Sequence, residues 1–436
     1  MNIRKIALDL LSEYEAGNKY VNLLLSSRSL DGLTREERAS LTALLYTAVE
    51  RKLTYDYYIC ALAKRAPEKI DAHTRNILRL GLCQIADMSS IPTFAAVNET
   101  VKLARNSGER AFVNGILRAA ARAPGELPLP DREKNFKRYL SVKYSFPLHL
   151  VKHFASLVGE AETEELLSYY NTVKYTDVTV NSLKTTTKDY INALNERGIE
   201  AVAEVDTPLS IRILRSVNPE SLPHFADGHI FVQDRASHVA TLALSPKRGE
   251  RVIDVCACPG GKSFSTAILS GDSGEIFSFD LHESKLSLIE SGAERLGLGS
   301  LRVDCRDALE PDESLFGTAD KVICDAPCSG LGVLAKKPDL RYKAPEVLED
   351  LPELQTAILT ESARYLKVGG TLVYSTCTLN PRENEEVISA FLSGNPAFAP
   401  EDFSAGAYSS EGGMLTLYPH RSHTDGFFIA KIVRKA

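Results

Sequence analysis

From about residue 236 onward, short apolar runs alternate with longer segments of helical periodicity, and this pattern limits the possible fold more than any other feature. Strands that alternate with helices predict a parallel sheet with crossover helices on its faces. Two last apolar runs, 414–418 and 426–433, predict a hairpin that adds an antiparallel strand at the sheet edge. Because ligands bind beyond the carboxyl ends of the strands in such a sheet, residues that follow strands are the first candidates for function. The strands expected from the pattern are 251–255, 275–280, 300–303, 319–325 and 370–375.

The first third of the chain differs, because its apolar residues recur with helical spacing throughout, beginning at Ile3. We therefore expect an all-helical bundle over residues 1–125. Three prolines within residues 123–131 indicate a linker. Residues 126–235 then show a strand–helix–strand pattern that is typical of a small α/β module. The expected domains are 1–125, 126–235 and 236–436.

Charge is distributed unevenly along the chain. The whole sequence has a net charge of −6, yet residues 1–150 carry 23 Lys and Arg against 16 Asp and Glu. A basic end on an otherwise acidic chain fits a polyanionic partner such as RNA. Ordinary scatter of surface charge would explain the same imbalance equally well.

Cysteine usage and hydropathy indicate the compartment. The eight cysteines form no Cys-x-x-Cys pair, which is poor spacing for a disulfide framework or a zinc site. No apolar run approaches the roughly 18 residues of a membrane span, and the start lacks the pattern of a signal peptide. We expect a cytoplasmic monomer with no metal site and no membrane contact.

A glycine-containing loop follows the first predicted strand of the sheet. The run Asp254-Val-Cys-Ala-Cys-Pro-Gly-Gly-Lys-Ser263 leads into a helix that is expected to begin at Ser263. The glycines let backbone approach a ligand, and the helix N-terminus with Lys262 favours an anionic group. Asp280 ends the second strand at the spacing of an acid that binds ribose hydroxyls. Asp307 follows the third strand, where it could accept a hydrogen bond from an adenine amine. The alternative to a ligand-binding site is that the loop is only a tight turn between a strand and a helix, and that Asp280 and Asp307 are exposed to solvent without a ligand.

Two cysteines follow the fourth and fifth predicted strands. Cys328 lies in Asp325-Ala-Pro-Cys-Ser-Gly330, and Cys377 lies in Tyr374-Ser-Thr-Cys-Thr378. Parallel strands end at one edge of the sheet, so both thiols are expected beside the ligand loop. A single buried cysteine is more often a small apolar residue than a nucleophile. Two cysteines at strand ends beside a nucleotide site instead favour thiolate chemistry.

These motifs resemble those of a known family. The runs Cys256-Ala-Cys-Pro-Gly-Gly-Lys262, Asp325-Ala-Pro-Cys-Ser-Gly330 and Ser375-Thr-Cys377 are similar to motifs of the Sun/RsmB family of bacterial ribosomal RNA cytosine-5 methyltransferases. The first third resembles the NusB-type RNA-binding domain of that family, and the middle segment resembles its linking module. Two positions depart from the family pattern. Cys258 stands in place of an alanine, and Thr179 stands in place of an arginine.

The resemblance implies a fold, a reaction and a set of site residues. The fold would comprise a NusB-like helical domain, a small α+β linking module and a Rossmann-like, S-adenosylmethionine-dependent methyltransferase domain. The reaction would methylate carbon 5 of cytosine 967 in 16S ribosomal RNA, with S-adenosyl-L-methionine as the methyl donor. Cys377 would be the nucleophile that attacks carbon 6, Cys328 would assist release, and Asp325 would take part in catalysis. The residues implied in binding S-adenosylmethionine are Cys256, Ala257, Cys258, Pro259, Gly260, Gly261, Lys262, Asp280, Asp307 and Asp325.

Other interpretations stay open. The chain could methylate a cytosine in another RNA, act as a NusB-type RNA-binding regulatory protein with an inactive methyltransferase domain, or methylate a small molecule or a protein. Binding of S-adenosylmethionine and transfer of label to RNA would discriminate between them. The basic segment 336–343, just after the Pro-Cys motif, is a further candidate for gripping the RNA.

Overall fold

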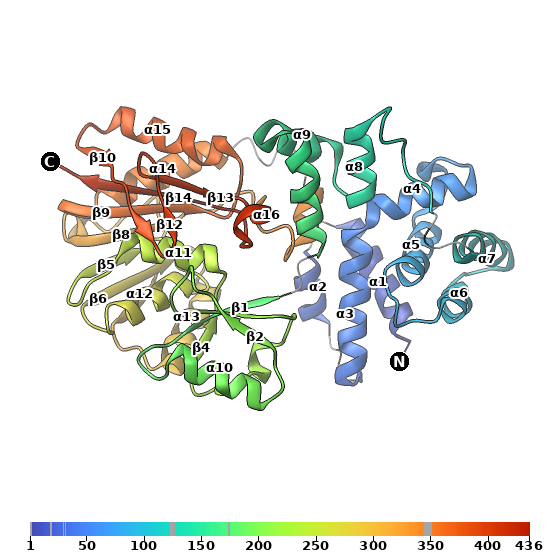
Figure 1. The fold of residues 1–436 in the computed structure, drawn as a ribbon, viewed down its shortest axis with the longest axis horizontal. Coiled ribbons are helices and arrows are strands. Elements are labelled where there is room, and N and C mark those ends of the chain that lie inside the picture. Colours follow the sequence, from blue (N-terminus) through green and yellow to red (C-terminus); the bar gives the residue numbers. More distant parts are fainter. Residues whose placement is uncertain are drawn as a thin grey trace. The chain divides into compact units, whose positions relative to one another are not determined.

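The computed structural model describes residues 2–17, 20–28, 30, 32–122, 125, 127–172, 175–343 and 351–436. The chain forms two compact units (Figure 1): a helical unit of residues 1–171 with 336–343, and a sheet unit of residues 172–335 with 344–436. Residues 123, 124 and 126 of the predicted linker lie outside the described residues. Among the described residues, no helix is long and apolar enough to cross a membrane.

The helices expected in the first third are present, and α5 forms the centre of their core. Nearly every residue of α5 from Thr74 to Ile85 is buried, and α1, α3, α4, α6 and α7 pack around it. Gly81 allows α7 to approach closely, because a Cβ there would lie 2.6 Å from the side chain of Leu117. The helices are α1 (Ile3–Ala16), α2 (Val21–Ser27), α3 (Arg35–Glu50), α4 (Lys52–Ala63), α5 (Ala72–Ala86), α6 (Thr93–Val101), α7 (Ser107–Arg122), α8 (Phe136–Tyr144) and α9 (Leu148–Thr172).

A short segment from late in the chain completes the helical unit. This segment contains η5 (Pro338–Tyr342). Arg341 is fully buried, and its guanidinium lies 3.5 Å from Glu50 Oε1 and 3.9 Å from the ring centre of Phe146. The burial of Arg341 corrects the expectation that segment 336–343 as a whole grips RNA, since this guanidinium binds protein groups. Lys336 and Lys337 are exposed.

The sheet unit begins with a small four-stranded antiparallel sheet in the order β2-β3-β1-β4. Thr179, at the position that departs from the family pattern, is buried and donates a hydrogen bond to Gln233 Oε1 at 3.0 Å. It is therefore a core contact. The elements are β1 (Thr176–Val180), α10 (Thr187–Glu196), β2 (Ala201–Ala203), β3 (Ser210–Ile213) and β4 (Ile230–Val232).

The second sheet has eight strands, and its main path runs in the order β10-β14-β9-β8-β5-β6-β7, with β13 also paired to β14. Strands β5 to β9 are parallel, as the alternating pattern predicts. The predicted hairpin forms between β13 and β14, and β14 pairs antiparallel with β9. The strands are β5 (Arg251–Asp254), β6 (Glu275–Asp280), β7 (Leu301–Cys305), β8 (Ala319–Asp325), β9 (Leu366–Thr376), β10 (Phe398–Pro400), β13 (Met414–Leu417) and β14 (Phe427–Arg434).

Both faces of this sheet are covered by helices (Figure 1), because its strands are apolar on both sides. Val252 of β5 belongs to the core beneath α11, α12 and α13, whereas its neighbour Ile253 belongs to the core beneath α14 and α15. The sheet and the helices on its two faces form three layers. The loops that follow the carboxyl ends of the parallel strands lie together at one edge of the sheet. The helices are α11 (Arg235–Leu244), α12 (Gly261–Leu269), α13 (Glu283–Leu296), α14 (Leu351–Ala363) and α15 (Glu385–Gly394).

Candidate active site

The order of the strands creates one switch point. From β5 the chain continues to β6 and β7 on one side and then crosses to β8 and β9 on the other. In open α/β sheets a crevice forms where the direction of winding reverses, outside the carboxyl ends of the strands. The glycine loop follows β5, and Asp325 ends β8. Two of the predicted motifs therefore flank the switch point.

The glycine loop is held against the neighbouring strand by backbone hydrogen bonds. The Ala257 N–H donates to the Phe279 carbonyl at 2.7 Å, and the Cys258 N–H donates to Asp280 Oδ2 at 3.1 Å. Helix α12 begins at Gly261, two residues before the expected Ser263. Gly260 has a φ of 108°, in the left-handed region, and a Cβ there would lie 2.4 Å from the Phe264 ring. Only glycine fits this turn.

The two acids predicted to bind a nucleoside lie at the ends of adjacent strands. Asp280 ends β6 and is half-buried; its second oxygen accepts a hydrogen bond from the His282 N–H at 3.1 Å. Asp307 follows β7, is also half-buried, and accepts from the Leu309 N–H at 2.9 Å. Backbone donors thus orient both carboxylates, which keep accessible oxygens for further donors.

Lys262 and Asp325 form an ion pair across the switch point. Lys262 is buried, and its Nζ lies 2.6 Å from Asp325 Oδ2 and 3.0 Å from Ser237 Oγ. Ser375 donates to the other Asp325 oxygen at 2.7 Å. Asp325 is half-buried and held from two sides. The Lys262 charge that the sequence assigned to an anionic ligand group lies against Asp325 in this structure.

The two predicted cysteines are brought together. Cys328 follows β8, Cys377 follows β9, and their Sγ atoms lie 3.2 Å apart. The Ala326 N–H donates to the Ser375 carbonyl at 3.0 Å, and the Gly332 N–H donates to the Cys377 carbonyl at 2.9 Å. These hydrogen bonds extend the pairing of β8 and β9 into the loops that follow the two strands. This pairing places the thiols side by side. Both residues are partly accessible.

Three nearby cysteines have different surroundings. Burial raises the pKa of the Cys256 and Cys324 thiols above their usual range, and both residues pack in the core beneath α14 and α15. Burial and the Asp280 charge raise the pKa of Cys258 to about 12. These cysteines stay protonated at neutral pH, which suits loop and core packing better than nucleophilic attack.

Several contacts that organise the site carry no sequence signal. Ser375 orients Asp325, and Glu383 accepts a hydrogen bond from the Ser329 N–H at 2.8 Å. Gly332 approaches the backbone of Gly426, where a Cβ on Gly332 would lie 1.9 Å from the Gly426 carbonyl oxygen. A serine near the end of a strand, a glutamate before a helix and isolated glycines are common in any sequence. Only tertiary contacts reveal their roles.

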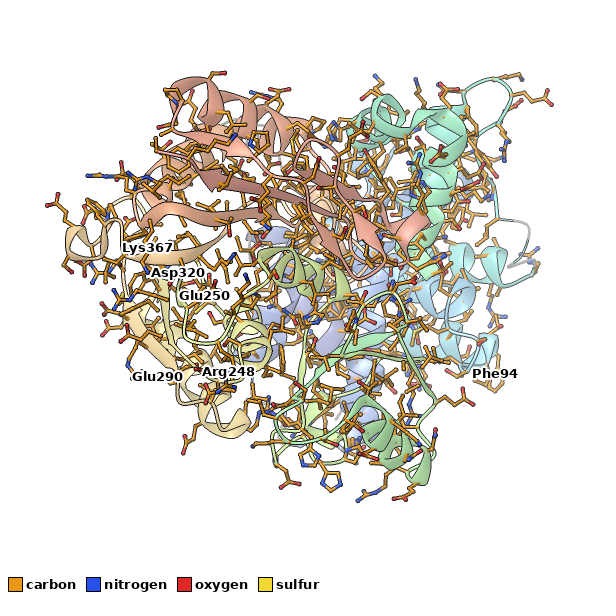
Figure 2. The ribbon with its side chains drawn as sticks, turned by 60° about the vertical axis from the view of Figure 1, so that its left-hand side comes forward. Phe94, Arg248, Glu250, Glu290, Asp320 and Lys367 are labelled. Carbon is orange, nitrogen blue, oxygen red and sulfur yellow. The ribbon has the colours of Figure 1, made fainter. Side chains whose placement is uncertain are left out.

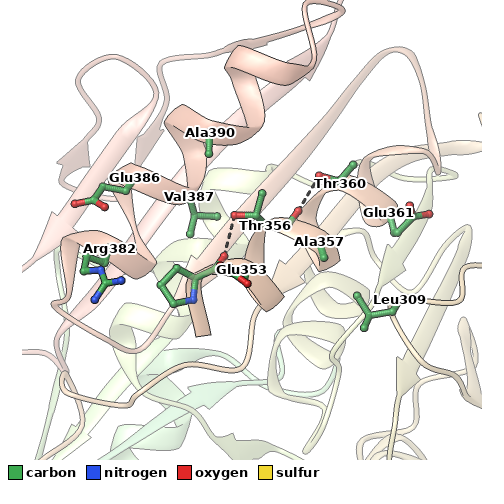
Figure 3. A pocket seen from close by; sticks show the side chains of 11 residues that line it. Leu309, Glu353, Thr356, Ala357, Thr360, Glu361, Arg382, Glu386, Val387 and Ala390 are labelled. Carbon is green, nitrogen blue, oxygen red and sulfur yellow. Dashed lines mark hydrogen bonds between the residues drawn. The ribbon is translucent and has the colours of Figure 1, made fainter. Parts of the chain in front are cut away.

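A groove of about 750 Å³ lies between α14 and α15 (Figure 3). Its lining includes the apolar side chains of Ala357 and Val387 and the charged side chains of Glu353, Glu361 and Arg382. Its lining contains none of the predicted site residues, so it is separate from the edge where the thiols and the glycine loop meet.

The site fits S-adenosylmethionine in the chemistry of its donor set. The carboxylates of Asp280 and Asp307 suit ribose hydroxyls and an adenine amine, and the backbone near Gly260 admits a close ligand. Asp325 adds a carboxylate on the other side of the switch point. These donors suit a nucleoside-bearing ligand, and they lie at the same sheet edge as the thiol pair.

Three models of protein families match segments of the chain. Residues 241–433 match the model of the 16S rRNA methyltransferase RsmB/F family, residues 1–122 match the NusB family, and residues 146–219 match the ferredoxin-like domain of RsmF/B-like methyltransferases. These matches cover the glycine loop, both cysteine motifs and the helical bundle.

Individual relatives extend over the whole chain. The proteins named "Probable ribosomal RNA small subunit methyltransferase B" are 35% identical in Bacillus subtilis (strain 168), over 100% of this chain and 99% of that protein, and 36% identical in Synechocystis sp. (strain ATCC 27184 / PCC 6803 / Kazusa), over 99% of each. One crystal structure, 27% identical, has a TM-score of 0.80 and covers 100% of this chain and 99% of that chain. The chain is an S-adenosylmethionine-dependent methyltransferase that acts on ribosomal RNA. It belongs to the RsmB/F family of 16S ribosomal RNA methyltransferases.

Proposed function

We propose that the chain methylates carbon 5 of cytosine 967 in 16S ribosomal RNA, through a covalent adduct between Cys377 and carbon 6 of the base. The observation that carries this proposal is the thiol pair, whose sulfur atoms lie 3.2 Å apart at the ends of adjacent strands. Carbon 5 of cytosine is a poor nucleophile, so a group that adds to carbon 6 is needed to activate it. A thiolate is well suited to that addition.

In the proposed reaction, Cys377 forms a bond to carbon 6, and the electron pair of the double bond between carbons 5 and 6 moves to carbon 5. S-adenosylmethionine supplies, from its sulfonium, the methyl group that carbon 5 takes up. A base then removes the carbon 5 proton, the double bond forms again, and the Cys377 sulfur leaves. The target base must be unstacked to reach this edge of the sheet.

The surroundings of the thiols support different roles for them. The hydrogen bond with Cys377, burial and nearby negative charges raise the pKa of Cys328 well above its usual range. Cys328 therefore keeps its proton and can donate it toward a Cys377 thiolate. We assign Cys328 to the release step. Asp325, oriented by Lys262 and Ser375, would bond the exocyclic amine or ring nitrogen of the base and stabilise charge during addition.

The proposed S-adenosylmethionine site comprises residues 256–262, Asp280, Asp307 and Asp325. Asp280 would bind the ribose hydroxyls and Asp307 the adenine amine. In this proposal Lys262 acts through Asp325, because its ammonium lies against that carboxylate.

A groove between α6 and α7 supports RNA contact by the helical unit. Phe94 is 72% exposed at the start of α6 (Figure 2), and the groove beside it has a volume of about 580 Å³. Exposed aromatic rings stack on unpaired bases, and guanidinium groups bind phosphates. Its lining contains two arginines and no acid: Thr93, Phe94, Val97, Asn98, Arg118, Ala121 and Arg122.

The domain division 1–125, 126–235 and 236–436 is part of this proposal, with RNA contact assigned to the first domain and catalysis to the last. We also propose a cytoplasmic monomer that needs no metal.

The target can be tested by bisulfite sequencing of 16S ribosomal RNA from a strain that lacks this chain. Cytosine 967 should lose its resistance to conversion, and a plasmid copy of the wild-type chain should restore it. If that cytosine stays protected and a cytosine in another RNA becomes convertible, the enzyme has a different target.

A further inference from the structure

Glu383 is a fully buried carboxylate that contacts the loops of both cysteines. It ends η7 (Pro381–Glu383), the short helix after Cys377. Its Oε2 accepts hydrogen bonds from the Ser329 N–H at 2.8 Å and from Gln355 Nε2 at 3.1 Å. Its Oε1 accepts from Asn380 Nδ2 at 2.9 Å. The two oxygens therefore receive donors from different loops.

Two of the donors belong to the segments that carry the two cysteines, and the third belongs to α14. Ser329 directly follows Cys328, and Asn380 lies three residues after Cys377. Gln355 of α14 also donates to the carbonyl of Pro327, the residue before Cys328, at 2.9 Å. A second link joins the loops directly, because the Ser329 and Thr378 hydroxyls lie 2.7 Å apart. The carboxylate is thus the common acceptor of both cysteine loops.

A buried carboxylate that receives neutral donors is costly for stability, and an apolar side chain would fill the space at lower cost. Its two oxygens can, however, satisfy donors that approach from two directions, which no apolar group can do. We propose that Glu383 is a positioning residue that holds the loops of Cys328 and Cys377 together, so that the two thiols meet in the geometry that the methyl transfer needs. This inference rests on the proposed covalent mechanism.

The negative charge of Glu383 has a separate consequence for Cys328. It is one of the charges that raise the pKa of the Cys328 thiol, after the hydrogen bond with Cys377, burial and the charge of Cys377. Glu383 therefore helps to keep Cys328 protonated, so that its thiol can donate toward the Cys377 sulfur. Substitutions of Glu383 can separate the effect of its position from the effect of its charge.

The test compares three variants of the full-length enzyme. Glu383→Gln removes the charge and one acceptor oxygen, Glu383→Asp keeps the charge but shortens the reach, and Glu386→Gln is a matched control on the exposed surface of α15. Each is assayed for turnover on 16S ribosomal RNA, for S-adenosylmethionine affinity, and for the pH dependence of Cys328 alkylation by iodoacetamide without RNA.

Misplacement of a reacting group by about 1 Å can cost 10²-fold in rate, so Glu383→Gln should lower kcat roughly 100-fold with little change in S-adenosylmethionine affinity. Its Cys328 should be alkylated roughly tenfold faster at neutral pH, because a nearby negative charge is removed. Glu383→Asp should keep the wild-type alkylation profile and still show a reduced kcat. Glu386→Gln should match the wild type in all three assays.

Unchanged turnover in Glu383→Gln, or full turnover in Glu383→Asp, would overturn the positioning role. If Glu383→Gln does not fold, Thr378→Val provides the second test, since it removes the hydroxyl link between the loops at nearly constant volume. It should lower kcat about tenfold, and unchanged kcat would contradict the inference. Failure of the covalent mechanism is a different result: the wild-type enzyme and Cys328→Ala would then form no adduct with RNA, whatever Glu383 does.

Discussion

Asp254 and Asp280 end neighbouring strands, yet their surroundings differ. Asp280 is half-buried and receives two backbone N–H groups. Asp254 is 1% exposed, and burial raises its pKa to about 7, against a smaller opposing effect of the Ser263 hydrogen bond. Sequence spacing identified Asp280 as a ligand-binding candidate, but no sequence pattern distinguishes a protonated buried acid from an ionised one.

Asp280→Ala should weaken S-adenosylmethionine binding, because it removes charge-assisted hydrogen bonds worth about 1.5–3 kcal/mol. Calorimetry should show that the affinity falls tenfold or more. Asp304→Ala, which removes a more exposed carboxylate of β7, should leave binding unchanged. Equal affinities for wild type and Asp280→Ala would place the ribose elsewhere.

Asp254→Asn should change the pH dependence of stability. The folded-state pKa of about 7 exceeds the ordinary 3.8, so the folded protein binds more protons between these values and its stability falls as pH rises through this window. Asn cannot ionise, so the stability of the variant relative to wild type should rise from pH 5 to 8. A pKa difference of this size corresponds to about 4 kcal/mol as an upper limit.

The variant must be compared with the wild type because His238 changes the pH dependence of stability in the direction opposite to Asp254. Burial lowers its pKa from 6.5 to about 4, so its contribution to stability is lost as pH falls through that range. Urea denaturation of both proteins at several pH values cancels this shared effect. A stability difference that stays constant from pH 5 to 8 would show that Asp254 is ionised throughout.

Among the elements, η5 shows most clearly what long-range packing decides. Its sequence lies between the Pro-Cys motif and α14, but its residues pack within the helical unit. Burial lowers the pKa of Arg341, although the guanidinium remains charged at any ordinary pH. The basic composition of 336–343 suggested RNA contact; the buried Arg341 does not fit that role, whereas Lys336, Lys337 and Lys343 are at least partly exposed.

Arg341→Met should destabilise the helical unit by about 3–5 kcal/mol, because it leaves the buried Glu50 carboxylate without this cation. The double variant Arg341→Met with Glu50→Gln should recover part of that stability. Lys337→Met, in the same segment but exposed, should change stability by less than about 0.5 kcal/mol. Denaturant unfolding would measure all three, and a destabilisation below about 1 kcal/mol in Arg341→Met would contradict a stabilising ion pair.

The strands of the large sheet were predictable and those of the small sheet only in part. Buried parallel strands such as β8 are continuous apolar runs, and its bounds match the expected ones. By contrast, β3 and β4 have four and three residues, too short for a periodic signal to emerge. Their pairing with β1 depends on tertiary contacts.

For the whole molecule, charge and exposed aromatic surface bear on RNA binding. Phe94→Ala should weaken RNA affinity by about 1–3 kcal/mol, because base stacking on the ring is removed.

Arg118→Gln with Arg122→Gln should also flatten the salt dependence of RNA binding, by roughly 0.7 in log–log slope for each phosphate that these side chains no longer bind on single-stranded RNA. Arg248→Gln is the control, because Arg248 lies just before the amino end of β5, whereas the site lies at the carboxyl ends of the strands. Unchanged affinity and slope in filter binding would make the α6–α7 groove unrelated to RNA.

The overall organisation and the meeting of the two cysteines could be predicted because strand register carries sequence order into space. Residues that follow parallel strands lie at one edge of the sheet, so the pattern of strands is enough to place Cys328 and Cys377 together. The partners of those residues could not be predicted in this way. Lys262 pairs with Asp325 and Glu383 joins both loops because of distances between side chains that no local pattern encodes.

The most direct test of the account is to trap the enzyme–RNA adduct. Cys377→Ala and Cys328→Ala are each incubated with 16S ribosomal RNA and S-adenosylmethionine, then separated on a denaturing gel. Cys328→Ala should show a shifted, protease-sensitive band, because attack and methylation proceed while release is slow. Cys377→Ala should show no such band, since the nucleophile is absent. A band with Cys377→Ala and none with Cys328→Ala would reverse the assignment of the two thiols.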